Sequence, residues 1–381
     1  MFNQKLIDAI VGNKDSSGCF IELGTRRRWS LGQGGLPWLL SSKFIVPPFS
    51  RCEELKSRSA KRAAILNCWL YSEKAATGGC TDGANHVLNH ELSTLVAQWE
   101  SDPLLFAPDQ LLRRIEALDL VDRYLPEGCL PGAPDTVEAA QMRQRLNSLR
   151  ASIEAANDRV YQDIRAQIRR GDQPESLLRW ARLALKGESA RKDAGNGYGF
   201  LDELISGVLS FEEPVDAPAE MEPELVAYQP TPARHIFDLI EAVDLTADDV
   251  LIDIGAGLGH VSLLVSICTP ARSIGIEREA AYVDQARRCA ERLNLGRVEF
   301  VQQDARAADL SAGTVFYLYT PFTGSVLRGV LDRLRQRASR GPIRVCSYGP
   351  CTPVLAHESW LEATTATTTR HVALFRSRIG A

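Results

Sequence analysis

The most informative hydrophobic pattern of the chain lies in its second half. Residues 250–254 form a short, nearly continuous apolar run, which is typical of a strand buried on both faces. Apolar residues then recur at helical spacing over 261–268, and Pro270 ends that helical pattern. A second apolar run over 273–276 is followed directly by Glu277. The pattern predicts a strand, a helix and a second strand that ends at an acidic residue.

The loop between the first predicted strand and the helix is rich in glycine. Gly255, Gly257 and Gly259 alternate with other residues, and Asp253 stands two positions ahead of them. Glycines let a backbone approach a ligand closely, and an acid at the end of the second strand can accept hydrogen bonds from both hydroxyls of a ribose. The dinucleotide-binding pattern G-x-G-x-x-G would need a glycine at the position of His260, so the spacing does not favour a dinucleotide.

The sequence Asp-x-Gly-x-Gly-x-Gly, with Glu277 after the second strand, resembles the first motif of class I S-adenosylmethionine-dependent methyltransferases. A pyrophosphate prefers bare amides at the positive end of a helix. S-adenosyl-L-methionine instead carries an amino-acid head and a sulfonium cation, which an acidic residue beside the loop suits. The resemblance implies that Asp253 and the glycine loop hold the methionine moiety and that Glu277 holds the ribose hydroxyls. An NAD-dependent oxidoreductase is the weaker alternative.

The apolar pattern of the second half continues in the same alternation. Predicted helices and strands follow one another over 279–294, 298–301, 314–319, 324–338 and 343–347. Two β-rich runs, 360–367 and 371–378, are typical of an antiparallel pair that closes a sheet. The resemblance covers residues 228–378 in the motif order of the family. It implies an α/β fold with a Rossmann-like, seven-stranded methyltransferase sheet whose last strand is antiparallel.

Further site residues follow from the resemblance. In this family an acid after the third strand binds the adenine amino group, which implies Asp304 for that role and the backbone amide of Ala305 for the ring. A block upstream of the first strand covers the methionine end of the cofactor, which implies Tyr228 and Thr231. Two alternatives stay open: Asp304 caps a helix, or the segment around Tyr228 is a linker stiffened by two prolines.

The residues after the fourth predicted strand correspond to the fourth motif of the family, which borders the transferable methyl group. The resemblance implies Tyr319, Thr320, Pro321 and Phe322 as the residues at the methyl acceptor. Methyltransferases that act on nucleobase amino groups carry Asn or Asp, two prolines and an aromatic residue here, so this sequence argues against that substrate. The motif order is loosely similar to that of lysine methyltransferases acting on the histone core. Those enzymes have paired asparagines where this chain has Tyr319 and Thr320, so their substrate is not carried over.

Two tyrosines lie close together on the fourth predicted strand. Tyr317 and Tyr319 are two residues apart, so strand alternation places them on one face. Tyr317 would lie deeper in the sheet and is interpreted as a core residue. No general base is identified, because a histidine at a helix start, such as His260, is more often structural.

The first half of the chain reads differently. Residues 1–215 are predicted to form a mainly α-helical N-terminal domain, ahead of a cofactor-binding methyltransferase domain over 216–381. The longest helix is predicted over 135–170, with Asp135 as its cap and Glu138 closing a capping box. Apolar residues recur along this helix at steps of three or four. The resulting stripe either packs on neighbouring helices, which is the simpler interpretation, or forms the seam of a homodimer.

Composition and charge limit the partners. The 381 residues carry a net charge of −4, which gives no sign of a global attraction to nucleic acid or to an anionic membrane. No apolar run approaches the roughly 20 residues of a membrane-spanning helix, and the N-terminus lacks a signal-peptide pattern, so we expect a cytoplasmic protein. Basic residues in 26–28 and 53–76 are interpreted as a solvated face in preference to a patch for an acidic partner.

The cysteines and histidines do not predict a metal site. The nine cysteines include no C-x-x-C pair, which indicates reduced thiols and not a zinc site or a disulfide framework. His86 and His90 are spaced for one face of a helix, but no third ligand is nearby.

The sequence therefore supports two classes of function. The first is a methyltransferase that uses S-adenosyl-L-methionine and acts on an unidentified acceptor, either a small molecule or a protein. The second is a non-catalytic protein that binds the same cofactor and uses its helical half to bind a partner. The altered fourth motif keeps the second class open.

Overall fold

The computed structural model describes residues 82–125, 136–172, 174–190, 199–211, 224–226 and 228–378. All of them belong to one compact unit. Several predicted features lie outside the described residues: the domain boundary at residue 215, the basic segments 26–28 and 53–76, and Asp135. The side chains of His86 and His90 are not described either.

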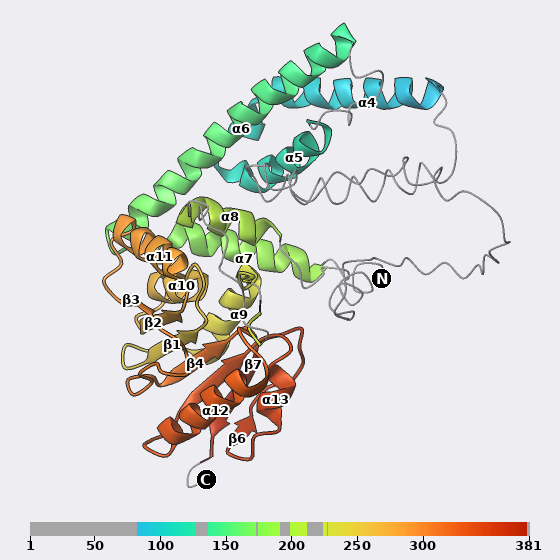
Figure 1. The fold of residues 1–381 in the computed structure, drawn as a ribbon. Helices are drawn as coiled ribbons and strands as arrows, with labels where there is room; N and C mark the ends of the chain where they lie inside the picture. The colour runs from blue at the N-terminus through green and yellow to red at the C-terminus, as the bar shows by residue number, and fades with distance from the viewer. Residues whose placement is uncertain are drawn as a thin grey trace, which may run out of the picture. The chain divides into compact units, whose positions relative to one another are not determined.

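The second half of the chain forms a seven-stranded sheet with the order β3-β2-β1-β4-β5-β7-β6 (Figure 1). Its strands are β1 (Val250–Ile254), β2 (Arg272–Glu277), β3 (Val298–Gln302), β4 (Val315–Leu318), β5 (Arg344–Ser347), β6 (Leu361–Ala363) and β7 (Ala373–Ser377). Strands β1 to β5 pair in parallel, whereas β7 is antiparallel to both of its neighbours. The predicted fold class, a Rossmann-like methyltransferase sheet with an antiparallel last strand, is confirmed.

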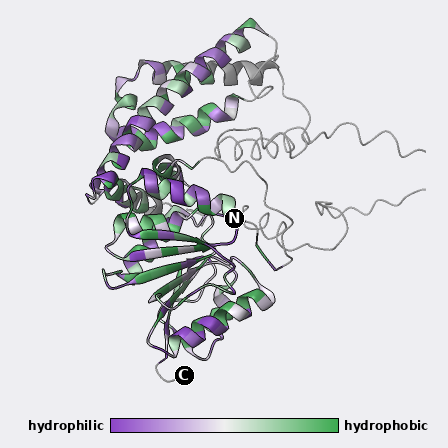
Figure 2. Ribbon diagram, turned by 60° about the vertical axis from the view of Figure 1, so that its left-hand side comes forward, coloured by the Kyte–Doolittle hydropathy of each residue, from purple (hydrophilic) through white to green (hydrophobic). Residues whose placement is uncertain are grey.

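Helices cover both faces of this sheet (Figure 1). They are α9 (Ala233–Val243), α10 (His260–Cys268), α11 (Ala280–Arg292), α12 (Gly324–Ala338) and α13 (Thr352–Ala356). Leu251 and Tyr317 are buried on the face that packs with α9, α10 and α11, whereas Ile252 and Phe316 are buried under α12 and α13. Successive strand residues thus enter opposite cores, as a period of two requires. The strands are largely hydrophobic (Figure 2), because a strand covered on both faces buries every side chain.

The first half of the chain is helical where it is described. It contains α4 (Asp82–Ser101), η1 (Pro103–Phe106), η2 (Pro108–Gln110), α5 (Leu111–Tyr124), α6 (Val137–Arg169), α7 (Glu175–Ala190) and α8 (Phe200–Leu209), of which η1 and η2 are short 3-10 helices. The apolar stripe of α6 is buried within the chain: Leu146 and Ile153 join a core with α4 and α5, and Ile164 joins a core with α7 and α8. The stripe therefore packs on neighbouring helices.

The start of α6 corrects one prediction. The N-cap is Thr136 and not Asp135, because the Thr136 hydroxyl accepts a hydrogen bond from the amide of Ala139 at 3.1 Å. Adjacent aspartate and threonine are both good capping residues, so the sequence alone did not separate them.

Among the described helices, none is long and apolar enough to cross a membrane.

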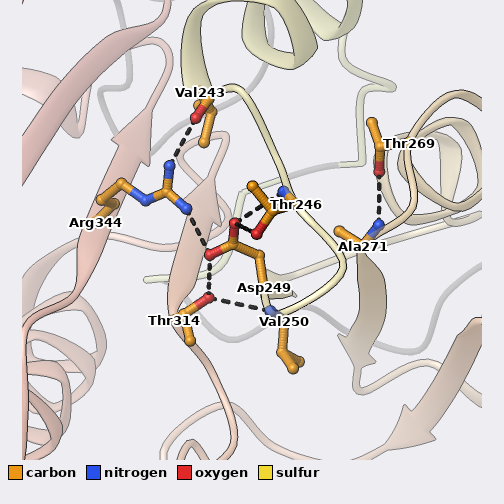
Figure 3. Close-up of polar contacts among 8 residues, drawn as sticks. All are labelled: Val243, Thr246, Asp249, Val250, Thr269, Ala271, Thr314 and Arg344. Carbon is orange, nitrogen blue, oxygen red and sulfur yellow. Dashed lines mark hydrogen bonds and ion pairs between the residues drawn. The ribbon is translucent and has the colours of Figure 1, made fainter.

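A buried acidic residue joins the amino ends of three strands (Figure 3). Asp249 precedes β1; it accepts hydrogen bonds from the hydroxyl of Thr314 at 2.8 Å, the guanidinium of Arg344 at 2.6 Å and the amide of Thr246 at 2.9 Å. Arg344 also donates to the carbonyl of Val243, at the end of α9, at 2.6 Å. Burial opposes ionisation of Asp249, but the hydrogen bonds outweigh it and lower the pKa of this carboxyl to about 2.

Candidate functional site

The glycine-rich loop lies at the carboxyl ends of β1 and β2. The amides of Gly255 and Ala256 both donate to the carbonyl of Ile276, at 2.9 and 3.0 Å, and this fixes the loop to the end of β2. Gly255, Gly257 and Gly259 have φ values of 80°, 55° and 82°, in a region that side-chain-bearing residues rarely adopt. The three glycines therefore meet a backbone requirement of this turn.

Asp253 is the acidic residue of the first motif, and it is almost completely buried, with 3% of its surface exposed. Among the described residues, one side chain donates to its carboxyl, namely the hydroxyl of Ser262 on α10 at 3.4 Å. Burial raises the pKa of Asp253 to about 7, and the charge of Glu277 acts in the same direction. Asp253 is thus a carboxyl group that titrates near neutral pH and would gain from a cation beside it.

Glu277, at the end of β2, turns its carboxylate back toward the glycine loop. Its Oε2 accepts a hydrogen bond from the amide of Gly257 at 2.8 Å, and its Oε1 accepts from the amides of Arg278 and Glu279 at 2.7 and 2.9 Å. Backbone donors therefore fix the position of this side chain. A carboxylate can accept about four hydrogen bonds, so Glu277 keeps capacity for a further donor.

Residues 224–226 and 228–232, here called the strap, pair with the fourth motif. The amide of Val226 donates to the carbonyl of Pro321 at 3.2 Å, and the amide of Thr323 donates to the carbonyl of Glu224 at 2.8 Å. The carboxylate of Glu224 also accepts from the amide of Val326 at 3.0 Å, in the first turn of α12. These contacts fix the start of the strap beside the carboxyl end of β4.

The strap places Tyr228 on the glycine loop. Its ring fills the space that a side-chain carbon on Gly257 would need. The same ring packs against Tyr282 of α11, with ring centroids 4.9 Å apart, and the Tyr228 hydroxyl lies 3.3 Å from Nδ1 of His260. Tyr228 therefore lies between the loop and α11.

A small cavity, partly open to solvent, lies between the strap, the glycine loop and β4. Five of the predicted site residues line it: Tyr228, Thr231, Asp253, Gly255 and Tyr319. Asp253 is the only carboxylate among the described residues around this cavity, and neither lysine nor arginine lines it. The cavity thus combines one buried acid with aromatic and hydroxyl groups.

Tyr317 also lines the cavity, although the sequence analysis placed it in the core. The side chain is indeed buried, with 1% exposed, but its hydroxyl lies 3.0 Å from the hydroxyl of Thr231. Tyr317 is the register partner of Asp253 on the adjacent strand. One pattern in the sequence could have indicated this role for Tyr317. Strand alternation places Tyr317 on the same face as Tyr319, and the adjacent strand carries the acid of the first motif.

The rest of the fourth motif does not line the cavity. Thr320 has a φ of 38°, and its buried hydroxyl donates to the carbonyl of Tyr348 and accepts from the amide of Cys351, both at 3.0 Å. Pro321 packs directly on Gly255, and Phe322 is buried in the core under α12. These three residues shape the loop after β4, whereas Tyr319 alone turns toward the cavity.

The predicted adenine-binding residues lie after β3 and also outside the cavity lining. The carboxylate of Asp304 pairs with the guanidinium of Arg306, with contacts of 3.0 and 2.6 Å, and accepts from the Arg306 amide at 2.8 Å. The Arg306 hydrogen bond lowers the pKa of Asp304. Ala305 packs against the core under α12. In this arrangement Asp304 caps a turn, and no helix follows it as the alternative given for it would require.

No protein-family model matches the sequence, and no curated protein matches it. Among solved structures, the chain is similar to an RNA methyltransferase from Salinibacter ruber in complex with S-adenosyl-L-homocysteine, with 27% identity over 39% of this chain and 92% of that chain and a TM-score of 0.32. It is also similar to a precorrin-6y C5,15-methyltransferase from Geobacter metallireducens, with 20% identity over 41% and 94% of the two chains and a TM-score of 0.32. A SAM-dependent methyltransferase from Aquifex aeolicus matches with 11% identity over 37% and 88% and a TM-score of 0.31.

At TM-scores this low, the assignment of the fold rests on the sheet itself. Five parallel strands in the order 3-2-1-4-5, followed by an antiparallel β7 inserted between β5 and β6, define the fold of class I S-adenosylmethionine-dependent methyltransferases. The glycine loop follows β1 at the carboxyl ends of the parallel strands.

Proposed function

We propose that this chain is an S-adenosylmethionine-dependent methyltransferase whose acceptor, a small molecule or a protein, binds beside Tyr319. The observation that carries the proposal is the cavity that Asp253 and the glycine loop share at the carboxyl ends of the strands. Open α/β sheets bind their ligands at that edge. The residues fit the cofactor, because a buried carboxyl beside the glycine loop suits a cationic ligand.

The roles that we propose for the site residues are those that the family resemblance implies. Asp253 and the backbone of residues 255–259 hold the methionine moiety, and Tyr228 and Thr231 close over it. Glu277, which the amide of Gly257 already fixes at the loop, accepts the ribose hydroxyls. Asp304 and Ala305 bind the adenine, and for this Asp304 shares its oxygens between Arg306 and the ring.

Bound S-adenosyl-L-methionine supplies a methyl group that its sulfonium already activates, so the task of the protein is alignment. Holding donor and acceptor in line can contribute about 7 to 11 kcal/mol to lowering the barrier. Pro321 packs on Gly255 and thereby fixes the end of β4 relative to the loop. The ring of Tyr348, which is buried, lies tilted against the ring of Tyr319 with centroids 4.6 Å apart and so supports the ring that faces the acceptor. Burial raises the pKa of Tyr319, so its phenol orients the acceptor as a neutral group.

Titration calorimetry tests the proposal directly. The purified chain is expected to bind both S-adenosyl-L-methionine and S-adenosyl-L-homocysteine, and the absence of heat with either ligand contradicts the cofactor assignment. Glu277→Ala is expected to weaken binding by about tenfold or more, because a carboxylate that accepts a hydrogen bond from the ribose is lost. Glu299→Ala, at an exposed position of β3, is the matched control and should bind as the wild type does.

The second candidate function is cofactor binding without catalysis. The observation that favours it is that the fourth motif uses the Thr320 hydroxyl and the Phe322 ring within the protein and directs only Tyr319 to the cavity. Incubation with a cell extract and a methyl-labelled cofactor separates the two candidates. Label transferred to an extract component supports the methyltransferase, whereas tight binding with no transferred label supports the binding protein.

A further inference from the structure

The buried end of the cavity is lined by four polar side chains. Thr231 of the strap, Asp253 of β1, Tyr317 of β4 and His260 of α10 all line it, and each has less than a tenth of its surface exposed. Nδ1 of His260 lies 3.3 Å from the Tyr228 hydroxyl, whereas the side chain of Gln229 is exposed and that of Tyr319 is half-buried. A ligand that reaches the buried end therefore meets one carboxyl group, one pair of hydroxyls and one imidazole.

The two hydroxyls carry one proton that is not used in the hydrogen bond between them. Thr231 and Tyr317 lie 3.0 Å apart and share a single hydrogen bond, in which one hydroxyl donates and the other accepts. Burial raises the pKa of Tyr317 well above its ordinary value, so the phenol keeps its proton. Two hydroxyls carry two protons, and only one is used between them. The pair therefore presents one O–H donor to a ligand at the buried end.

Two backbone amides of the glycine loop are already used. The amides of Gly255 and Ala256 both donate to the carbonyl of Ile276. Neither lysine nor arginine is among the described residues that line the cavity, and Nδ1 of His260 already faces the Tyr228 hydroxyl, so the hydroxyl pair is the donor that we assign to an anionic ligand group at the buried end. A cationic group, in contrast, finds the carboxyl of Asp253, whose register partner is Tyr317.

We infer that Thr231 and Tyr317 form a hydroxyl pair that selects adenosyl ligands carrying an amino-acid head: the pair donates to the head's carboxylate while Asp253 accepts its ammonium group. This inference rests on the proposed function, because it concerns the same cavity, and it adds Tyr317 as a specificity-determining residue. A structural role for the pair is the competing explanation, since the same hydrogen bond joins the strap to β4. The two explanations differ in whether the affinity that is lost when a hydroxyl is removed depends on which ligand is bound.

Two ligands that differ only in the head provide the test. S-adenosyl-L-homocysteine and 5′-methylthioadenosine share an adenosine and a neutral thioether, but only the first carries an amino-acid head. Calorimetry with Tyr317→Phe should show affinity for S-adenosyl-L-homocysteine reduced by about tenfold or more, because a donor to a charged group is lost. Affinity for 5′-methylthioadenosine should stay within about twofold of the wild type, because that ligand does not reach the hydroxyls.

Thr231 gives an independent pair of variants. Thr231→Val keeps the shape of the side chain and removes the hydroxyl, so it should reproduce the selective loss. Thr231→Ser keeps the hydroxyl and should retain the selectivity of the wild type. Should Tyr317→Phe fail to fold, the Val and Ser variants carry the same test. Tyr161→Phe, which removes a half-buried phenol hydroxyl on α6 away from the cavity, is the control and should bind both ligands normally.

The outcomes separate this inference from the function on which it rests. An equal loss of affinity for both ligands, or no loss for either, overturns the head-selecting role and leaves the cofactor assignment in place. A wild-type protein that binds both ligands equally well also overturns it. A wild-type protein that binds neither ligand removes the proposed function and this inference together.

Discussion

The buried carboxyl of Asp253 links stability to function at the scale of one residue. An aspartate is ordinarily ionised at neutral pH, but burial raises the pKa of Asp253 to about 7. In the folded state the group is therefore neutral over the range in which the unfolded chain has already lost its proton. The contribution of Asp253 to the free energy of unfolding is most favourable below the unfolded pKa near 4, and it is lost as pH rises to the folded pKa near 7. The site thus keeps an acid whose ionised form destabilises the fold. A cationic ligand beside this carboxylate would offset the destabilisation.

Replacing this carboxyl with an amide of the same shape should separate the two effects. At pH 8 the free energy of unfolding of Asp253→Asn is expected to exceed that of the wild type by about 2 to 4 kcal/mol, because the amide never ionises. The variant should therefore unfold at a higher temperature at that pH. At pH 4 the two proteins should have similar stability. Thermal unfolding between pH 4 and pH 8 measures this, with exposed Asp284→Asn as the control. Parallel pH profiles for wild type and Asp253→Asn would contradict the raised pKa.

At the scale of elements, the contact between the strap and the glycine loop determines the shape of the site. Gly257 has a positive φ, and a side chain there would overlap the ring of Tyr228. The strap is in turn paired with the fourth motif through Val226 and Pro321. Three segments that are distant in sequence therefore depend on one another, and a change in one should be compensated by a change in another.

A pair of variants measures this dependence. Gly257→Ala should lower the free energy of unfolding by about 3 kcal/mol, through a strained left-handed alanine and overlap with the Tyr228 ring. In a Tyr228→Ala background the same change should cost only about 1 kcal/mol, because the strain remains and the overlap is relieved. Denaturant unfolding of the four proteins gives both values. Gly329→Ala, in the interior of α12 with open space around it, is the control and should be neutral or slightly stabilising. Equal costs in both backgrounds would show that ring and loop are not coupled.

The elements were predictable from the sequence to the extent that local patterns determine them. The apolar run of β1, the glycine loop and the end of α10 before Pro270 depend on neighbouring residues, and the structure confirms them. The environment of individual side chains depends on distant segments. The Thr320 hydroxyl is engaged by the Tyr348–Cys351 turn, about thirty residues away, and Tyr317 lines a cavity only because the strap brings Thr231 to it. Spacing within a motif carries no information about such partners.

At the scale of the whole molecule, the helical half and the sheet share a core. Residues of α6, α7 and α8 belong to the same buried cluster as those of α9, α10 and α11. Polar contacts accompany this packing: Cys289 and Arg292 of α11 both donate to the carbonyl of Leu209, which ends α8. The described helices before the strap are therefore part of the structure that supports the sheet, and unfolding of the two parts should be coupled.

The pH dependence of unfolding for the whole molecule combines two aspartates of opposite sign. Asp249 at the amino end of β1 has a pKa lowered to about 2, so its contribution is present above the unfolded pKa near 4 and is lost as pH falls toward 2. Asp253 acts in the reverse direction between about pH 4 and pH 7. The unfolding temperature of the wild type should therefore rise from pH 2 to pH 4 and fall from pH 4 to pH 7, as far as these two groups determine it.

In Asp249→Asn, the unfolding temperature should no longer rise from pH 2 to pH 4, but it should still fall from pH 4 to pH 7. At pH 7 this variant should lose about 2 kcal/mol of unfolding free energy, because the Arg344 and Thr314 donors no longer face a carboxylate. Below pH 2 it should match the wild type, whose Asp249 is then protonated. Asp248→Asn, one residue earlier and exposed, is the matched control and should follow the wild type throughout. An Asp249→Asn variant with wild-type stability at pH 7 would show that the network joining β1, β4 and β5 is not what stabilises the amino end of the sheet.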